Sequence, residues 1–110
     1  ALPIYVGGIA RMADAIGLQS ETRGPGAQVD WIAQALAAGK KVVANGDYYE
    51  LGPDRNPNAT SGHYVTVYGM DGDTYLVHDP ADRAVDRVSR AELERFINSN
   101  PNGGYQFAIG

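Results

Sequence analysis

Residues 62–81, GHYVTVYGMDGDTYLVHDPA, determine the fold that this sequence predicts. Two runs rich in valine, threonine and tyrosine, GHYVTVYG at 62–69 and DTYLVHD at 73–79, have the composition of β-strands. They are separated by Met70-Asp71-Gly72, a short turn that ends in glycine. The stretch therefore predicts an antiparallel β-hairpin inside a sheet.

The length of the turn sets the register of this hairpin. A three-residue loop with glycine last predicts four opposed pairs, Gly69 with Asp73, Val67 with Tyr75, Val65 with Val77, and His63 with Asp79. Opposed side chains have Cβ atoms about 4.5–5.5 Å apart, so His63 and Asp79 are expected to form a hydrogen bond. A two-residue Asp71-Gly72 loop would instead place Asp79 on the opposite face.

A histidine held by an aspartate is an arrangement used in general-base catalysis. The carboxylate accepts a hydrogen bond from one imidazole nitrogen and stabilises the imidazolium, while the other nitrogen takes a proton from a nucleophile. His63 and Asp79 are therefore the candidate catalytic residues. The same pattern also fits a buried histidine bonded to an acid at a strand end, and both interpretations stay open.

Other site chemistries have weaker support. The second histidine, His78, is expected on the opposite face in a structural role. Two histidines on opposite faces, without recognisable ligand spacing, do not indicate a zinc site, and no phosphate-loop pattern occurs. We expect neither a metal nor a cofactor.

The segments around the hairpin complete an α+β fold. Two segments with helical apolar spacing end at Gly17 and Gly39, and Ser89 with Glu92 form a capping-box pattern. We predict helices at 9–16, 29–38 and 90–98, strands at 41–45 and 105–109, and a turn at 20–26. The segment 46–61, rich in glycine, proline and asparagine, is predicted to be a loop that borders the site.

Composition limits the classes of function. A length of 110 residues with 44% hydrophobic content suits a single domain with one core. The net charge of -4 argues against nucleic acid as a partner, and no segment has the ~20 apolar residues of a membrane span. There is no cysteine, which excludes a cysteine nucleophile within these residues. No targeting segment is visible, so the compartment stays open, a secreted or extracytoplasmic location included.

Residues 62–81 resemble the His-to-Asp segment of the bacteriocin-processing, C39-like type of papain-like cysteine peptidase, in which an aromatic-rich strand after Gly-His leads through a DGD turn to Asp-Pro. Residues 30–46 resemble the family's helix and following strand, and residues 88–109 resemble its last helix and terminal strand. The resemblance implies a papain-like fold with His63 as the general base and Asp79 as the acid that orients it.

Two functional residues of that family match nothing here. These are the cysteine at the start of an N-terminal helix and the upstream glutamine of the oxyanion hole. The resemblance therefore implies that residues 1–110 are the C-terminal part of a larger papain-like domain. The cysteine helix, absent from this chain, is expected upstream or on a separate chain.

Three functions are consistent with these observations. The first is the His/Asp portion of a cysteine hydrolase that cleaves peptide or related acyl bonds, with a peptide or protein as substrate. The second is a catalytically inactive papain-like domain of a binding or toxin type. The third is a peptidoglycan amidase or related hydrolase that uses the same residues. A Cys-Gly pair at a helix start upstream would favour an enzyme.

Overall fold

The computed structural model describes residues 20–52, 56, 58–81 and 85–110. In chain order the elements are β1 (Ser20–Arg23), α2 (Val29–Ala37), β2 (Lys41–Asp47), the 3-10 helix η1 (Tyr48–Glu50), β3 (Gly62–Asp71), β4 (Thr74–His78), β5 (Arg87–Val88), α3 (Arg90–Asn98) and β6 (Gln106–Ile109). The helices predicted at 29–38 and 90–98 are confirmed as α2 and α3. The helix predicted at 9–16 lies outside the described residues.

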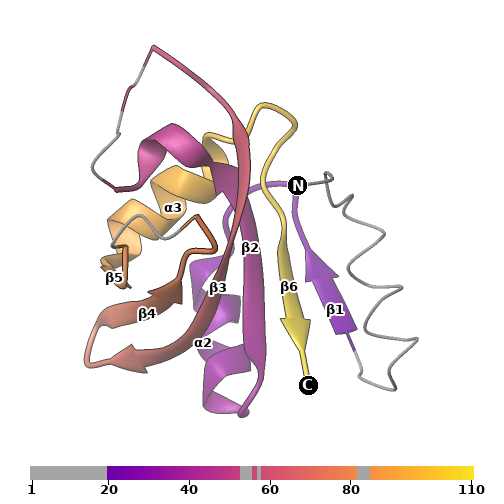
Figure 1. Cartoon of the computed structure of the whole chain (residues 1–110). Helices are drawn as coiled ribbons and strands as arrows, with labels where there is room; N and C mark the ends of the chain where they lie inside the picture. The colour runs from indigo at the N-terminus through magenta and orange to yellow at the C-terminus, as the bar shows by residue number, and fades with distance from the viewer. Residues whose placement is uncertain (1–19, 53–55, 57, 82–84) are drawn as a thin grey trace.

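The strands form one antiparallel sheet in the order β1-β6-β2-β3-β4-β5 (Figure 1). The predicted hairpin is β3 and β4, and it lies inside the sheet between β2 and β5. The prediction of an α+β fold with an antiparallel sheet and flanking helices is therefore confirmed. The strand predicted at 41–45 is longer than expected, because β2 continues through Gly46 to Asp47.

Both helices pack on the same face of the sheet, and the core lies between them and the strands (Figure 1). Strand side chains on this face alternate with those on the other, as the two-residue period of a strand requires. The fully or nearly fully buried apolar residues of this layer are Val29, Ile32, Val42, Ala44, Leu51, Val65, Val67, Tyr75, Val77, Val88, Leu93, Phe96, Ile97 and Ala108. The helix face of the sheet thus forms a continuous apolar core.

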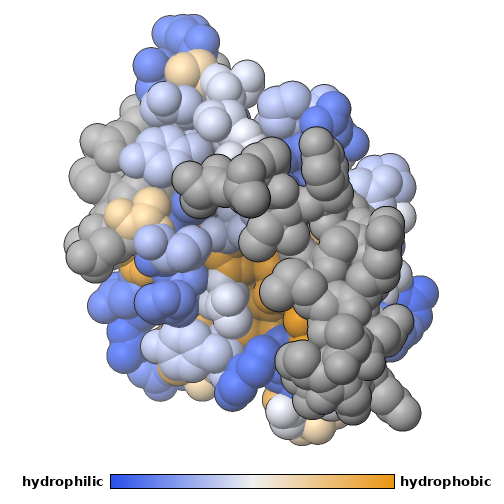
Figure 2. Space-filling model, turned by 45° about the vertical axis from the view of Figure 1, so that its right-hand side comes forward, coloured by the Kyte–Doolittle hydropathy of each residue, from blue (hydrophilic) through white to orange (hydrophobic). Residues whose placement is uncertain are grey.

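The opposite face of the sheet carries a smaller set of apolar side chains. Val43 and Phe107 are register partners on this face, and Phe107 has no exposed surface. Figure 2 shows that hydrophilic residues prevail over the described part of the visible side, and that an apolar patch lies near its centre. Both faces of the sheet therefore bury apolar side chains.

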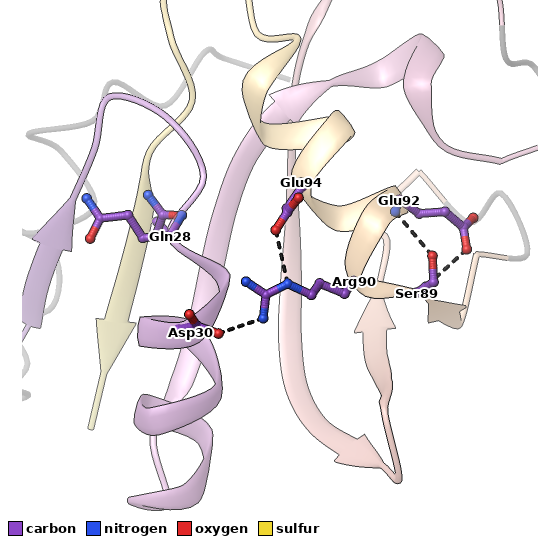
Figure 3. Close-up of polar contacts among 7 residues, drawn as sticks. Gln28, Asp30, Ser89, Arg90, Glu92 and Glu94 are labelled. Atoms are coloured by element: carbon purple, nitrogen blue, oxygen red, sulfur yellow. Dashed lines mark hydrogen bonds and ion pairs between the residues drawn. The ribbon is translucent and has the colours of Figure 1, made fainter.

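Helix α3 begins where its capping pattern predicts. The Ser89 hydroxyl accepts a hydrogen bond from the Glu92 backbone N–H at 3.2 Å, and the Glu92 carboxylate accepts one from the Ser89 N–H at 3.0 Å (Figure 3). Two of the N–H groups that a helix start leaves without partners are satisfied in this way. The predicted capping box is confirmed, and it fixes the start of α3 at Arg90.

Strand β1 corrects the prediction of a turn at 20–26. Residues 20–23 pair with β6, although their side chains are largely exposed and lack apolar alternation. Buried Gln106 stabilises the following bend: its side-chain amide donates to the carbonyls of Arg23 and Gly26, and its carbonyl accepts from the Gln28 N–H. Backbone hydrogen bonds therefore hold β1 in place, and the sequence pattern does not reveal them.

Candidate active site

The hairpin register differs from the predicted one. Asp71 pairs with Thr74, so the turn has only two residues, Gly72 and Asp73, with Gly72 at a φ of 61°. Glycine at the first position of a two-residue hairpin turn favours this geometry. The predicted pairs of Gly69 with Asp73, Val67 with Tyr75 and Val65 with Val77 are wrong, because Val77 pairs with Val67.

A bulge at Tyr68 changes the register a second time. Val67 pairs with Val77, whereas Gly69 pairs with Leu76, so Tyr68 is an extra residue in β3. Without the bulge, a two-residue turn would leave Asp79 and His63 on opposite faces. With it, the register continues so that Asp79 faces the position of Val65, on the same face as His63.

His63 and Asp79 are therefore diagonal neighbours on one face, and the prediction of direct opposition is wrong. Their hydrogen bond is nevertheless present, with 2.7 Å between His63 Nε2 and Asp79 Oδ1. The diagonal separation of about 7–8 Å between two such positions is within reach of a histidine side chain. The predicted contact of the two residues is confirmed, by a different register.

The two partners differ in exposure. The Asp79 side chain is 1% exposed and the His63 side chain 14%. Asp79 Oδ1 also accepts a hydrogen bond from the Ala81 backbone N–H at 2.9 Å, which helps to fix the carboxylate. Because an ionised carboxylate only accepts, the neutral imidazole carries its proton on Nε2 and has its lone pair on Nδ1. The arrangement can hold one imidazole tautomer and leaves Nδ1 as the basic nitrogen.

The end of β2 supports the strand that carries His63. Gly46 is the register partner of His63, and the aromatic ring of Phe96 packs directly over it. The Asn100 side-chain amide donates a 2.7 Å hydrogen bond to the Gly46 carbonyl. The strand pair at the site is thus fastened to the C-terminal part of α3.

The segment predicted as a loop at 46–61 does border the site, as expected. Its start is more ordered than predicted, since β2 is followed directly by η1. The ring of Tyr48 lies edge-on against the imidazole of His63, with 5.2 Å between ring centroids and 84° between planes. Sequence reasoning placed this segment beside His63 but did not identify Tyr48. The YY pair directly after a buried strand is the signal that could have indicated it.

His78 is exposed at the end of β4, and the register places it on the opposite face from Val77. Within the described residues, no group of three or more histidine and acidic side chains is arranged to hold a metal ion. The pair of His63 and Asp79 is therefore the candidate site.

A separate groove of about 400 Å³ lies between the first turns of α2 and α3. It is lined by Ala27, Gln28, Val29, Asp30, Trp31, Gln34, Arg90 and Glu94. Its charged groups pair with one another: Arg90 binds Asp30 at 2.6 Å and Glu94 at 3.1 Å (Figure 3). Through the hydrogen bond first and the charge second, Arg90 lowers the pKa of the Asp30 carboxyl. These surface ion pairs thus join α2 and α3 across the groove.

This network predicts a pH effect. Because the pKa of Asp30 is lower in the folded chain, the pair stabilises the fold above the ordinary aspartate pKa of about 4, and this contribution is lost as the pH falls through the folded pKa. Arg90→Gln is expected to raise the pKa of Asp30 and to flatten the pH dependence of unfolding below about pH 5.

Carboxyl NMR titration of Asp30 measures the first effect directly. Arg87→Gln is the matched control, because Arg87 pairs with Asp71 in the hairpin. An unchanged Asp30 titration in the Arg90 variant would contradict the assigned cause.

Comparison with known proteins agrees with the fold. The crystal structure of a candidate C39-like peptidase from Bacillus anthracis matches with a TM-score of 0.64 and 17% sequence identity, over 94% of this chain and 58% of that one. The fold is therefore that of a papain-like, C39-like peptidase, and this chain spans little more than half the length of that protein.

The family match is more specific than the fold. The family model described as Butirosin biosynthesis protein H, N-terminal, matches residues 6–80, and the chain belongs to this family. The matched range includes both His63 and Asp79. A search of curated proteins gave no significant match. No helix in the described ranges is long and apolar enough to cross a membrane.

Proposed function

We propose that this chain supplies the general base and the orienting acid of a papain-like cysteine hydrolase that cleaves peptide or related acyl bonds. The observation that carries the proposal is the 2.7 Å hydrogen bond between His63 Nε2 and the almost fully buried carboxylate of Asp79. None of the 110 residues is a cysteine, so the thiol has to come from outside them. An upstream segment or a separate chain is the source that we propose.

The reaction follows from the roles of the two imidazole nitrogens. His63 Nδ1 takes the proton of the cysteine thiol, and the thiolate attacks the carbonyl carbon of the substrate. The tetrahedral intermediate collapses, the carbon-nitrogen bond breaks, and the imidazolium returns its proton to the leaving amine. His63 then takes a proton from water, which attacks the acyl-enzyme thioester. The carbon-sulfur bond breaks, the acid is released, and the imidazolium returns its proton to the leaving thiolate.

Asp79 acts in this scheme through His63. An anionic carboxylate at hydrogen-bond distance stabilises the imidazolium that forms when the thiol is deprotonated. Burial strengthens this interaction, because little water is present to screen the two charges. Burial also has a cost for the carboxylate, which the N–H of Ala81 helps to offset.

A second function, a papain-like binding domain without catalysis, is favoured by one observation. The chain has the base and the acid but no cysteine, and a hydrogen-bonded pair of this kind also stabilises a strand end. In that case His63 and Asp79 have a structural role, and the domain binds a partner without catalysis.

A reconstitution experiment separates the two functions. The chain alone, the chain mixed with a cysteine-bearing upstream segment, and the polypeptide of the complete reading frame are assayed on peptide and thioester substrates. We expect no hydrolysis by the chain alone. Thiol-dependent hydrolysis, blocked by iodoacetamide, is expected once the cysteine is supplied. Activity that persists after alkylation would contradict the cysteine mechanism, and no activity in any combination would favour the binding domain.

A further inference from the structure

The two ends of the segment between β2 and β3 are held together by a buried carboxylate. Asp47 is 1% exposed, and its Oδ1 accepts hydrogen bonds from the backbone N–H groups of Tyr49 at 3.1 Å and Ser61 at 3.0 Å. The Tyr48 N–H donates to the Ser61 carbonyl at 2.7 Å. One side chain thus ties the first turn of the segment to the residue that precedes β3.

The same turn is also fastened to α3. Glu50 forms an ion pair with Arg95 at 3.0 Å, and its carboxylate is largely shielded from solvent, with 12% of the side chain exposed. Leu51, 2% exposed, belongs to the hydrophobic core. A short turn held at Asp47, Glu50 and Leu51 has little freedom to move relative to the sheet.

Tyr48 projects from this fixed turn onto the imidazole. Its ring is perpendicular to that of His63 at 5.2 Å, and the ring of Tyr49 is in turn perpendicular to that of Tyr48 at 5.0 Å. Edge-to-face contacts of this kind are directional, so each ring limits the rotation of its neighbour. The imidazole therefore has the Asp79 carboxylate at Nε2 and an aromatic ring beside its plane.

We propose that Tyr48 is a positioning residue that holds the imidazole of His63 in its working orientation. A single hydrogen bond at Nε2 leaves the imidazole able to swing about this hydrogen bond. When the hydrogen bond opens, the ring can also rotate by half a turn. Such a rotation would exchange Nδ1 with a carbon and remove the basic nitrogen from its place. A perpendicular ring on a rigid turn opposes this rotation. The catalytic meaning of this inference rests on the proposed function, whereas the orientation itself does not.

The test measures the orientation without an activity assay. In the 110-residue chain with ¹⁵N-labelled histidine, the Nε2 proton of His63 is expected to exchange slowly with water, because it is held in the Asp79 hydrogen bond. Tyr48→Ala is expected to speed this exchange about tenfold, the scale set by the loss of one aromatic pair. Tyr48→Phe, which keeps the ring, should restore the slow exchange. Tyr68→Ala, at the exposed bulge residue, is the control.

Three outcomes would overturn the proposal: unchanged exchange in Tyr48→Ala, fast exchange in Tyr48→Phe, or equally fast exchange in Tyr68→Ala. Circular dichroism verifies that each variant is folded. Should Tyr48→Ala fail to fold, Tyr48→Leu replaces it, since leucine fills space without a ring plane, and slow exchange in that variant would also contradict the proposal. Because the readout is the imidazole itself, a failure here is distinct from a failure to find hydrolysis.

In a reconstituted enzyme the same variants separate positioning from substrate binding. Tyr48→Ala is expected to lower kcat about tenfold with little change in KM, because an imidazole out of place slows proton transfer without altering affinity. A change in KM alone would assign Tyr48 to substrate binding and overturn the positioning role.

Discussion

His63→Ala is expected to reduce thiol-dependent hydrolysis about a thousandfold or more in the reconstituted protein, because no other group replaces the base that deprotonates the thiol. The fold should survive, since the His63 side chain is partly exposed and lies at the rim of the core. Rates measured with and without iodoacetamide, alongside thermal unfolding, test both parts of this expectation.

The second histidine provides a matched control. His78→Ala removes the same side chain from the next strand, at an exposed position, and should leave the rate within about twofold. Asp79→Asn is expected to lower the rate about a hundredfold or more, because an amide does not stabilise the imidazolium. Equal losses in the His63 and His78 variants would show that the effect is not specific to the proposed base.

Gly46→Ala is expected to destabilise the fold strongly, by about 3 kcal/mol. A Cβ at this position would lie 2.5 Å from both Cε2 and the carbonyl oxygen of Phe96, so either the helix or the strand has to move. For a domain of this size that loss corresponds to a fall in Tm on the order of 10 °C. Thermal unfolding followed by circular dichroism measures it.

Gly69→Ala is the control for this variant. Its added Cβ would make an ordinary contact of 3.7 Å with Leu76, in a strand of the same sheet. The change in stability should stay below about 1 kcal/mol. A similar loss at both positions would indicate a general sensitivity of the strands to substitution, and would contradict the role given to the contact between Gly46 and Phe96.

Those parts of the fold that depend on local chemistry could be predicted from the sequence. Two such features are the capping box, at Ser89 and Glu92, and the apolar spacing of residues 29–36. Each depends on contacts within one helix turn or along one helix face, and both predicted helices are present. The hairpin was predicted for the same reason, since alternating β-formers around a glycine turn need no distant partner. Contact between His63 and Asp79 was predicted from this hairpin, although it forms through a different register.

The remaining features depend on long-range contacts that leave no local pattern. The bulge at Tyr68 has no signature in the local sequence, and together with the two-residue turn it makes the predicted register incorrect. Strand β1 is held by backbone pairing with β6 and by the Gln106 side chain, more than 80 positions away from Arg23 in the sequence. The Tyr48 contact depends on how the turn after β2 folds back, and this is fixed by Asp47 and α3.

The extra residue in β3 bears on how this protein should be aligned with others. Val67 pairs with Val77 and Gly69 with Leu76, so the strand contains one residue more than an unbulged hairpin with the same pairs would need. A homologous hairpin one residue shorter could present the same histidine and aspartate on the same face. The gap in such an alignment belongs at Tyr68, and a gap placed in the DGD turn would shift the pairs that lie between the bulge and the turn.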